Sequence, residues 1–177
     1  MNMTHYMELL AANQPWNLII FMAIPVGLAE TVVITELYIL FTRRTGGWVR
    51  RINRWAGIVV GLYFVGIIAY LLTTAVWPIT VAGEWRTALD VTAVAAYLLG
   101  GVPLLLVALQ DLGLIYRSRT PEQKLGWHAT YVAAFLILGH LAMIVGMADP
   151  GLLGYPGPQS QAMPMDHGAM MHDHTGH

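Results

Sequence analysis

The residues best suited to chemistry stand at the carboxyl end of the chain, where methionine and histidine alternate with aspartate. Thioether combined with imidazole favours Cu(I), and imidazole combined with carboxylate can take Cu(II), Zn(II) or Ni(II). Copper is the better match because zinc gives no reason for so many thioethers. The alternative is a flexible tail of chance composition. The predicted ligands are Met163, Met165, Met170, Met171, His167, His172, His174 and His177.

A second set of soft ligands lies in an apolar stretch. Met143 and Met147 follow His140 at i+3 and i+7, which places the three side chains along one face of a helix. An imidazole beside thioethers would again suit Cu(I). Ordinary packing of methionine against neighbouring helices is the competing interpretation.

Four ionisable residues, Glu30, Glu36, His128 and His140, fall inside or at the edge of apolar stretches. A charged group at the centre of a membrane helix costs about 2.5–3.5 kcal/mol on insertion scales, so each needs a partner or a cavity. Glu30 and Glu36 do not share a helix face and are not a catalytic pair. Glu30 and His140 fall at similar depths, so we predict that they meet. They are predicted to form either a hydrogen bond between helices or part of a relay that also contains Glu36 and His128.

Two aspartates, Asp90 and Asp111, are expected near the membrane interfaces, as helix caps or as partners of Arg86 and the other arginines. Haem is a disfavoured cofactor, because a b-type site needs two axial ligands at one depth on facing helices. His128 and His140 belong to one helix, about 18 Å apart. Ligation by His140 with Met22, or with a dimer partner, stays open.

These residues must be positioned by membrane helices. The chain of 177 residues is 56% hydrophobic and only 11% charged, and its apolar residues form four blocks. A helix crosses the hydrocarbon core with about 20 residues, so each block can span a bilayer. We predict an all-α, four-transmembrane-helix bundle over residues 1–149, with spans at about 16–41, 55–77, 88–116 and 127–147. Residues 150–177 form a Gly/Pro- and Met/His-rich flexible tail.

Basic residues predict the orientation of the bundle. Eight of the nine Lys and Arg residues lie in the two connections between the first and second spans and between the third and fourth. The positive-inside rule places these connections in the cytoplasm. Both termini are then outside, which predicts a multi-pass protein of the bacterial inner membrane with periplasmic termini.

Glycine and proline predict how the helices pack. Gly57, Gly61 and Gly66 in the second span allow close approach of another helix in lipid. Pro25 and Pro103 interrupt the first and third spans, and each should free a carbonyl one turn earlier. Such a carbonyl could face a cavity or simply shape the helix.

Composition also excludes several functions. A net charge of -1 gives no basic surface for nucleic acid. The chain has no cysteine, so thiolate metal sites and iron–sulfur clusters are excluded. No nucleophile–base constellation or phosphate-binding loop is present, and we do not predict an enzyme.

Two resemblances follow from these motifs. The M-x-M-D-H-G-x-M-M-H tail resembles the Met/His motifs of periplasmic copper-resistance proteins, which implies contact with copper. The NQPWN segment with AETxxITELYILFTRR resembles an uncharacterised group of small bacterial four-helix membrane proteins labelled permeases, which implies the fold and no catalytic residue.

The sequence leaves three functions open. The leading hypothesis is binding and handling of copper, or a similar soft metal, with the tail capturing the ion and the bundle anchoring or relaying it. The second is an accessory subunit of a larger membrane complex or a homo-oligomer. The third is a haem-binding electron carrier or quinone-linked membrane protein that uses His140.

Overall fold

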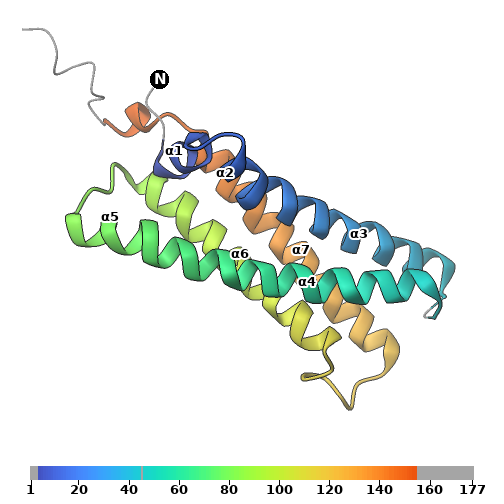
Figure 1. Cartoon of the computed structure of the whole chain (residues 1–177). Coiled ribbons are helices and arrows are strands. Elements are labelled where there is room, and N and C mark those ends of the chain that lie inside the picture. The colour runs from blue at the N-terminus through green and yellow to red at the C-terminus, as the bar shows by residue number, and fades with distance from the viewer. Residues whose placement is uncertain (1–3, 45, 155–177) are drawn as a thin grey trace, which may run out of the picture.

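The structure of the protein is a computed structural model, and its described part is helical. The structure describes residues 4–44 and 46–154, which contain no strand. The tail residues predicted to bind metal lie outside the described residues. Four long helical segments lie side by side, as Figure 1 shows, and the predicted all-α bundle is confirmed.

Each long segment is one helix or a series of helices that continue into one another. The first contains α2 (Trp16–Leu18), the π-helix η1 (Ile19–Ala23) and α3 (Ile24–Thr42). The second contains α4 (Trp48–Leu71), the π-helix η2 (Leu72–Val76) and α5 (Trp77–Ala82). The third is α6 (Ala88–Asp111) and the fourth is α7 (Pro121–Gly146). A short helix, α1 (His5–Ala11), precedes them, and a 3-10 helix, η3 (Pro150–Leu153), follows them.

All four segments are long and apolar enough to cross a membrane, with 27, 35, 24 and 26 residues. Their bounds differ most from the predicted spans in the second segment, which begins at Trp48 rather than near Trp55. The helix therefore already includes three arginines that sequence reasoning placed in a loop. The third segment ends earlier than predicted, at Asp111, and Gly113 just beyond it has a positive φ of 77°.

Large apolar side chains cover the outside of the bundle. Ile34 on α3, Leu62 on α4, and Ile137 and Ile144 on α7 are all more than half exposed. So many exposed large apolar side chains are unusual for a soluble monomer and suit contact with lipid. The fold is consistent with a multi-pass membrane protein.

The helix ends are set by local sequence signals. Thr120 caps α7 by accepting a hydrogen bond from the backbone N–H of Gln123, whose side chain accepts from the backbone N–H of Thr120. Pro121 follows at the first helical position, where a missing N–H costs nothing. Gly83 ends α5 in the left-handed conformation, with a φ of 67°.

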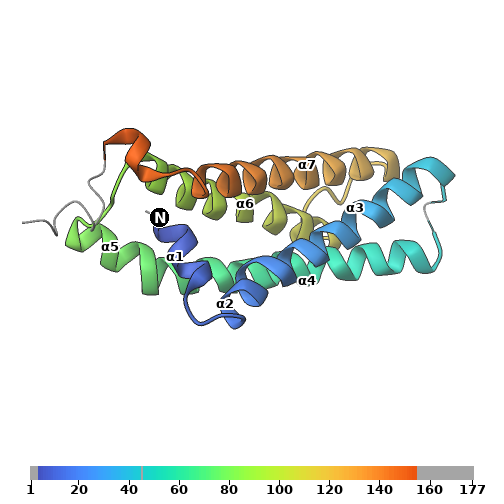
Figure 2. The same ribbon diagram turned by 90° about the horizontal axis from the view of Figure 1, so that it is seen from above.

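The two ends of the bundle differ in charge. Residues 43–44, 46–47 and 112–120 lie at one end, which we call the basic end, and include Arg43, Arg44, Arg117 and Arg119. The opposite end, which we call the amino-terminal end, contains α1, the connection 83–87 and the end of α7 (Figures 1 and 2). Figure 2 shows α3 close to α7 at the basic end and farther from it toward the amino-terminal end.

Glycines allow α4 and α6 to pack closely. A Cβ at Gly61 would lie 2.5 Å from the carbonyl oxygen of Leu104, and a Cβ at Gly57 would lie 2.3 Å from Oδ2 of Asp111. Gly66, on the same helix, has no neighbour within 4 Å of such an atom. The predicted packing role therefore holds for Gly57 and Gly61 and not for Gly66.

Candidate functional site

Three buried ionisable residues form a cluster near the basic end, which we call the His128 cluster. His128 on α7 approaches Glu36 on α3 through Nδ1, 2.7 Å from Oε2, and Asp111 on α6 through Nε2, 3.1 Å from Oδ2. The three side chains are 0%, 4% and 1% exposed. The cluster also includes Arg50 of α4, whose Nη2 lies 3.9 Å from Oδ1 of Asp111. Residues from four helices thus meet at one point.

Polar side chains of α4 support this cluster. Asn53 is fully buried and donates through Nδ2 to the carbonyl oxygen of Val32 and to Oγ1 of Thr35, at 3.1 and 3.0 Å. Its Oδ1 accepts from Nη1 of Arg50 at 3.0 Å. Arg54 donates through Nε to the backbone carbonyl of Asp111 at 2.8 Å. The amide and both guanidinium groups therefore fix the position of α4 against α3 and α6.

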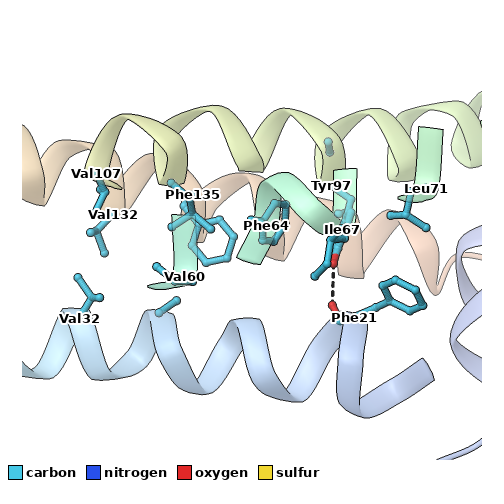
Figure 3. Packing of buried hydrophobic residues seen from close by; sticks show 14 of the residues in the cluster. Phe21, Val32, Val60, Phe64, Ile67, Leu71, Tyr97, Val107, Val132 and Phe135 are labelled. Carbon is cyan, nitrogen blue, oxygen red and sulfur yellow. Dashed lines mark hydrogen bonds between the residues drawn. The ribbon is translucent and has the colours of Figure 1, made fainter. Parts of the chain in front are cut away.

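A separate cavity of about 250 Å³ lies farther toward the amino-terminal end. We call it the aromatic cavity, because aromatic rings from η1, α4, α6 and α7 form much of its wall. Figure 3 shows the side chains of this part of the core. Drug-sized pockets are usually about 300–1,000 Å³, so this cavity suits a small ligand. Its lining residues are Phe21, Met22, Pro25, Val26, Ala29, Glu30, Phe64, Tyr97, Phe135, Leu136, Gly139, His140 and Met143.

Two thioethers and one imidazole line this cavity. Met22 comes from η1, while His140 and Met143 come from α7. Nδ1 of His140 lies 2.7 Å from the carbonyl oxygen of Leu136. A carbonyl can only accept, so Nδ1 carries the proton and Nε2 of the neutral ring keeps its lone pair. This hydrogen bond is the common way in which proteins orient a histidine that binds metal through Nε2.

Backbone carbonyls near the cavity are released by Pro25. The ring of a proline displaces the carbonyl four residues earlier and has no N–H to offer it, and that carbonyl belongs here to Phe21. Tyr97 on α6 donates its hydroxyl to the carbonyl of Phe21 at 2.7 Å (Figure 3), and Tyr63 on α4 donates to that of Ile20 at 3.1 Å. The predicted free carbonyl is therefore present and is bound by tyrosine.

The short helix α1 closes the amino-terminal end. Oγ1 of Thr4 donates to the carbonyl of Gly146 at 2.6 Å. The backbone N–H of His5 donates to Oδ1 of the fully buried Asp90 at 2.7 Å, and the His5 ring contacts the other oxygen of that carboxylate. Polar contacts thus tie α1 to both α6 and α7.

The chain was compared with known families and structures. A model of the family of unknown function DUF6803 matches residues 1–162. The chain belongs to this family. No curated protein and no solved structure matches it.

The structure divides the four predicted relay residues between the His128 cluster and the aromatic cavity. Glu36 and His128 are hydrogen-bonded in the His128 cluster. Glu30 and His140 line the aromatic cavity, as expected from their similar depths, but no hydrogen bond joins them among the described residues. About 9 Å of helix rise separates Glu30 from Glu36, so the two sites are not in contact.

The predicted soft-ligand stripe is divided. His140 and Met143 face the aromatic cavity, while Met147 caps the end of α7 and is 68% exposed. Among the described residues, no group of three or more His, Asp or Glu side chains has an arrangement that could hold a metal ion. A metal in the cavity would depend on thioether ligands.

The two aspartates have more specific partners than predicted. Asp90 binds His5, a residue that sequence reasoning did not use. Asp111 faces Arg50, as one of the predicted arginine partners, but also His128. Arg86 pairs instead with Glu8 of α1, at 2.7 Å.

Sequence reasoning missed the buried Asn53 and its contact with the half-buried Arg50. A helix that begins near residue 48 places Arg50, Asn53, Gly57 and Gly61 on one face at spacings of three and four. This periodicity is visible in the sequence once the helix is extended past Trp55. Met22 was considered only as an alternative haem ligand, and nothing in its local pattern signals the cavity.

Proposed function

We propose that this protein binds a soft metal ion, with a preference for copper(I), at the outer face of a bacterial inner membrane. The supporting observation is the aromatic cavity, which is lined by His140, Met143 and Met22. Nδ1 of His140 is occupied by the carbonyl of Leu136, which leaves Nε2 available as a metal ligand. Thioether and imidazole ligands match Cu(I), and hard cations would require more oxygen ligands.

The tail is the second part of the proposal. Its methionines and histidines supply ligands of the same kind as the cavity. The positive-inside rule places the basic end in the cytoplasm, which puts the tail and the cavity end of the bundle outside. In this arrangement the tail captures the ion and the bundle anchors the tail or receives the ion from it.

The test is Cu(I) binding by the full-length protein in detergent, measured in competition with a chromogenic Cu(I) chelator. We expect tight binding by the unmodified protein and loss of most bound copper on deletion of residues 163–177. In the truncated protein, His140→Ala and the double variant Met22→Leu/Met143→Leu should each remove the remaining copper. Met147→Leu is the matched control, because Met147 lies outside the cavity.

Two results would overturn the proposal. Copper binding no tighter than micromolar by the full-length protein would exclude a physiological copper site. Equal copper content in the truncated protein and its His140→Ala variant would remove the cavity from the mechanism, leaving at most a role for the tail.

The aromatic wall favours a second candidate ligand, a quinone ring. Phe21, Phe64 and Phe135 offer apolar faces around His140 and Glu30, which could bind the polar edge of such a ring. An absorption spectrum of native protein detects haem, which absorbs visible light, whereas Cu(I) bound to thioethers has no visible band. A bound quinone is detected in an organic-solvent extract of the protein, because its ultraviolet absorption overlaps that of the aromatic side chains. The volume of the cavity argues against haem.

A further inference from the structure

We propose that the His128 cluster is a reversible proton-binding site, filled from the basic end, whose protons hold α3 against α7. The inference does not depend on the metal proposed above, because the cluster lies outside the aromatic cavity. It rests on the proton requirement of two hydrogen bonds, on the surroundings of the cluster, and on the position of the contact between helices.

The two hydrogen bonds of His128 to carboxylates require two protons. Each ring nitrogen of His128 lies within hydrogen-bonding distance of a carboxylate oxygen. An ionised carboxylate only accepts, so each of the two contacts requires a proton between nitrogen and oxygen. With both protons present, two positive charges, on His128 and Arg50, balance two negative charges, on Glu36 and Asp111. Release of one proton to water leaves one contact with two facing lone pairs and the cluster with a net negative charge.

A cavity at the basic end offers protons a route to the cluster. A cavity of about 130 Å³ lies at the basic end, with Arg50, Ile39, Lys124 and Leu125 among its lining residues. It is large enough for a few water molecules, each of which takes about 30 Å³ in the liquid. Arg50 belongs both to this cavity and to the His128 cluster, and its side chain is 30% exposed. Water in this cavity can therefore reach the edge of the cluster.

Three valines, which we call the valine layer, separate the cluster from the aromatic cavity. Val32, Val107 and Val132 each lie one helical turn from a member of the cluster, namely four residues before Glu36, four before Asp111 and four after His128. They are 1%, 0% and 5% exposed, and Figure 3 shows them grouped across the core. An apolar layer without hydrogen-bonding groups gives a proton no path, so exchange is directed to the basic end.

The His128 cluster joins α3 to α7. Among the described residues, the bond between His128 and Glu36 is the one hydrogen bond between α3 and α7. Oε1 of Glu36 is buried without a hydrogen-bond partner, so its carboxylate depends on His128. Asp111 keeps Arg50 if the ring loses a proton. Because α3 and α7 also form two walls of the aromatic cavity, separating them would widen that cavity.

Other charged or titratable groups near His128 complete its surroundings. Arg54 of α4 binds the backbone of Asp111, and Lys124 and Tyr131 lie one turn away on α7 itself. The side chain of Lys124 is directed to the backbone of Arg117, and Tyr131 shares a hydrogen bond with Tyr116. None of these three side chains forms a hydrogen bond with the His128 ring, so the two carboxylates determine its protonation.

Nitrogen-15 NMR of histidine-labelled full-length protein tests the proton site. The chain contains seven histidines, and His128→Gln identifies the signals of His128 by their disappearance. We expect both ring nitrogens to be protonated at low pH and one to lose its proton as the pH is raised through the neutral and mildly alkaline range, because two carboxylates flank the ring. An unchanged His128 signal throughout this range would overturn the proposal.

Distance measurement tests the connection between the helices. The absence of cysteine allows a clean spin-label pair at Leu40→Cys on α3 and Gly126→Cys on α7, both exposed and near the basic end. We expect the distance distribution to shift to longer values at the pH where His128 loses its proton. Titration of His128 without any shift in distance would overturn the mechanical role.

Two variants separate this role from general loss of structure. Glu36→Gln keeps the shape of the side chain, and its amide can either donate to or accept from the ring, so the contact survives in both protonation states. We expect the pH-dependent shift in distance to disappear. Glu122→Gln, which removes an exposed carboxylate on α7 outside both the cluster and the aromatic cavity, should keep the shift. The opposite pattern would contradict the assignment.

Discussion

The two histidines of α7 have different chemistry although both lie in the membrane domain. His128 uses both ring nitrogens to bind carboxylates, which leaves no lone pair for a metal. His140 uses Nδ1 for the carbonyl of Leu136, and its side chain lines the aromatic cavity. Residue type alone could not separate them, because the difference lies in the partners supplied by α3, α6 and the helix backbone.

Removal of His128 should strongly destabilise the bundle. His128→Ala leaves Glu36 and Asp111 buried without the cation between them, and breaking a buried ion pair by removing one partner costs about 3–5 kcal/mol. The free energy of unfolding, measured by denaturant titration in bicelles, should fall by that amount. His140→Ala is the control and should cost about 1 kcal/mol, since it loses one hydrogen bond to its own helix. Equal losses would show that the His128 cluster contributes little to stability.

Tyr97 should contribute through its hydroxyl group. Tyr97→Phe leaves the buried carbonyl of Phe21 without this donor, and an unsatisfied buried polar group costs about 1–3 kcal/mol. The same unfolding measurement should show a smaller loss for Tyr63→Phe, whose hydrogen bond to Ile20 lies at an exposed position. A larger loss for Tyr63→Phe would contradict the assignment of Tyr97 to the carbonyl released by Pro25.

At the scale of the helices, proline and π-helix occur together. The π-helix η1 ends two residues before Pro25, and η2 ends two residues before Pro78. A π-helical turn changes the hydrogen-bonding register where proline has no N–H to donate, and thereby lets the helix continue through the proline. In the first segment the same irregularity releases the carbonyls that Tyr97 and Tyr63 bind.

The contact between α4 and α6 should be sensitive to a single methyl group. Gly61→Ala would place a Cβ 2.5 Å from the carbonyl oxygen of Leu104, and a backbone atom cannot rotate away. Overpacking of this kind typically costs about 1–3 kcal/mol. Gly66→Ala should have little effect or stabilise α4, because no atom lies within 4 Å and alanine has the higher helix propensity. Thermal unfolding in detergent should therefore rank the two variants in this order.

At the scale of the whole molecule, the sequence predicts the helices better than the contacts between them. Length and apolar character are sufficient to locate four membrane helices, because any chain segment in lipid must satisfy its own backbone. Which helix faces which depends on small local features, such as the space beside Gly57 that admits the Asp111 carboxylate. The prediction that Glu36 and His128 belong to one relay did not include their direct contact, because rise along a helix gives depth and not direction.

The same limit applies to the two ends of the bundle. His5 lies ahead of the first apolar block and has no local signal of burial beside Asp90. Its role appears only when α1 lies against α6. Asp111, by contrast, stands near arginines in the sequence, and its contact with Arg50 follows the general expectation of charge pairing. Interactions between charged groups at one end are thus easier to anticipate than contacts made by a helix that returns across the bundle.

The charge asymmetry of the molecule predicts its orientation, and the absence of cysteine makes the test direct. We expect Gly46→Cys, at the basic end, to react with a membrane-impermeant maleimide only after spheroplasts are lysed. Glu84→Cys, in the opposite connection, should react in intact spheroplasts, because the positive-inside rule retains the arginine-rich connections in the cytoplasm. Both positions are exposed, so burial does not explain a failure to react. Reaction of Gly46→Cys in intact spheroplasts, with protection of Glu84→Cys, would reverse the orientation and place the aromatic cavity and the tail on the cytoplasmic side, where capture of copper from the periplasm is impossible.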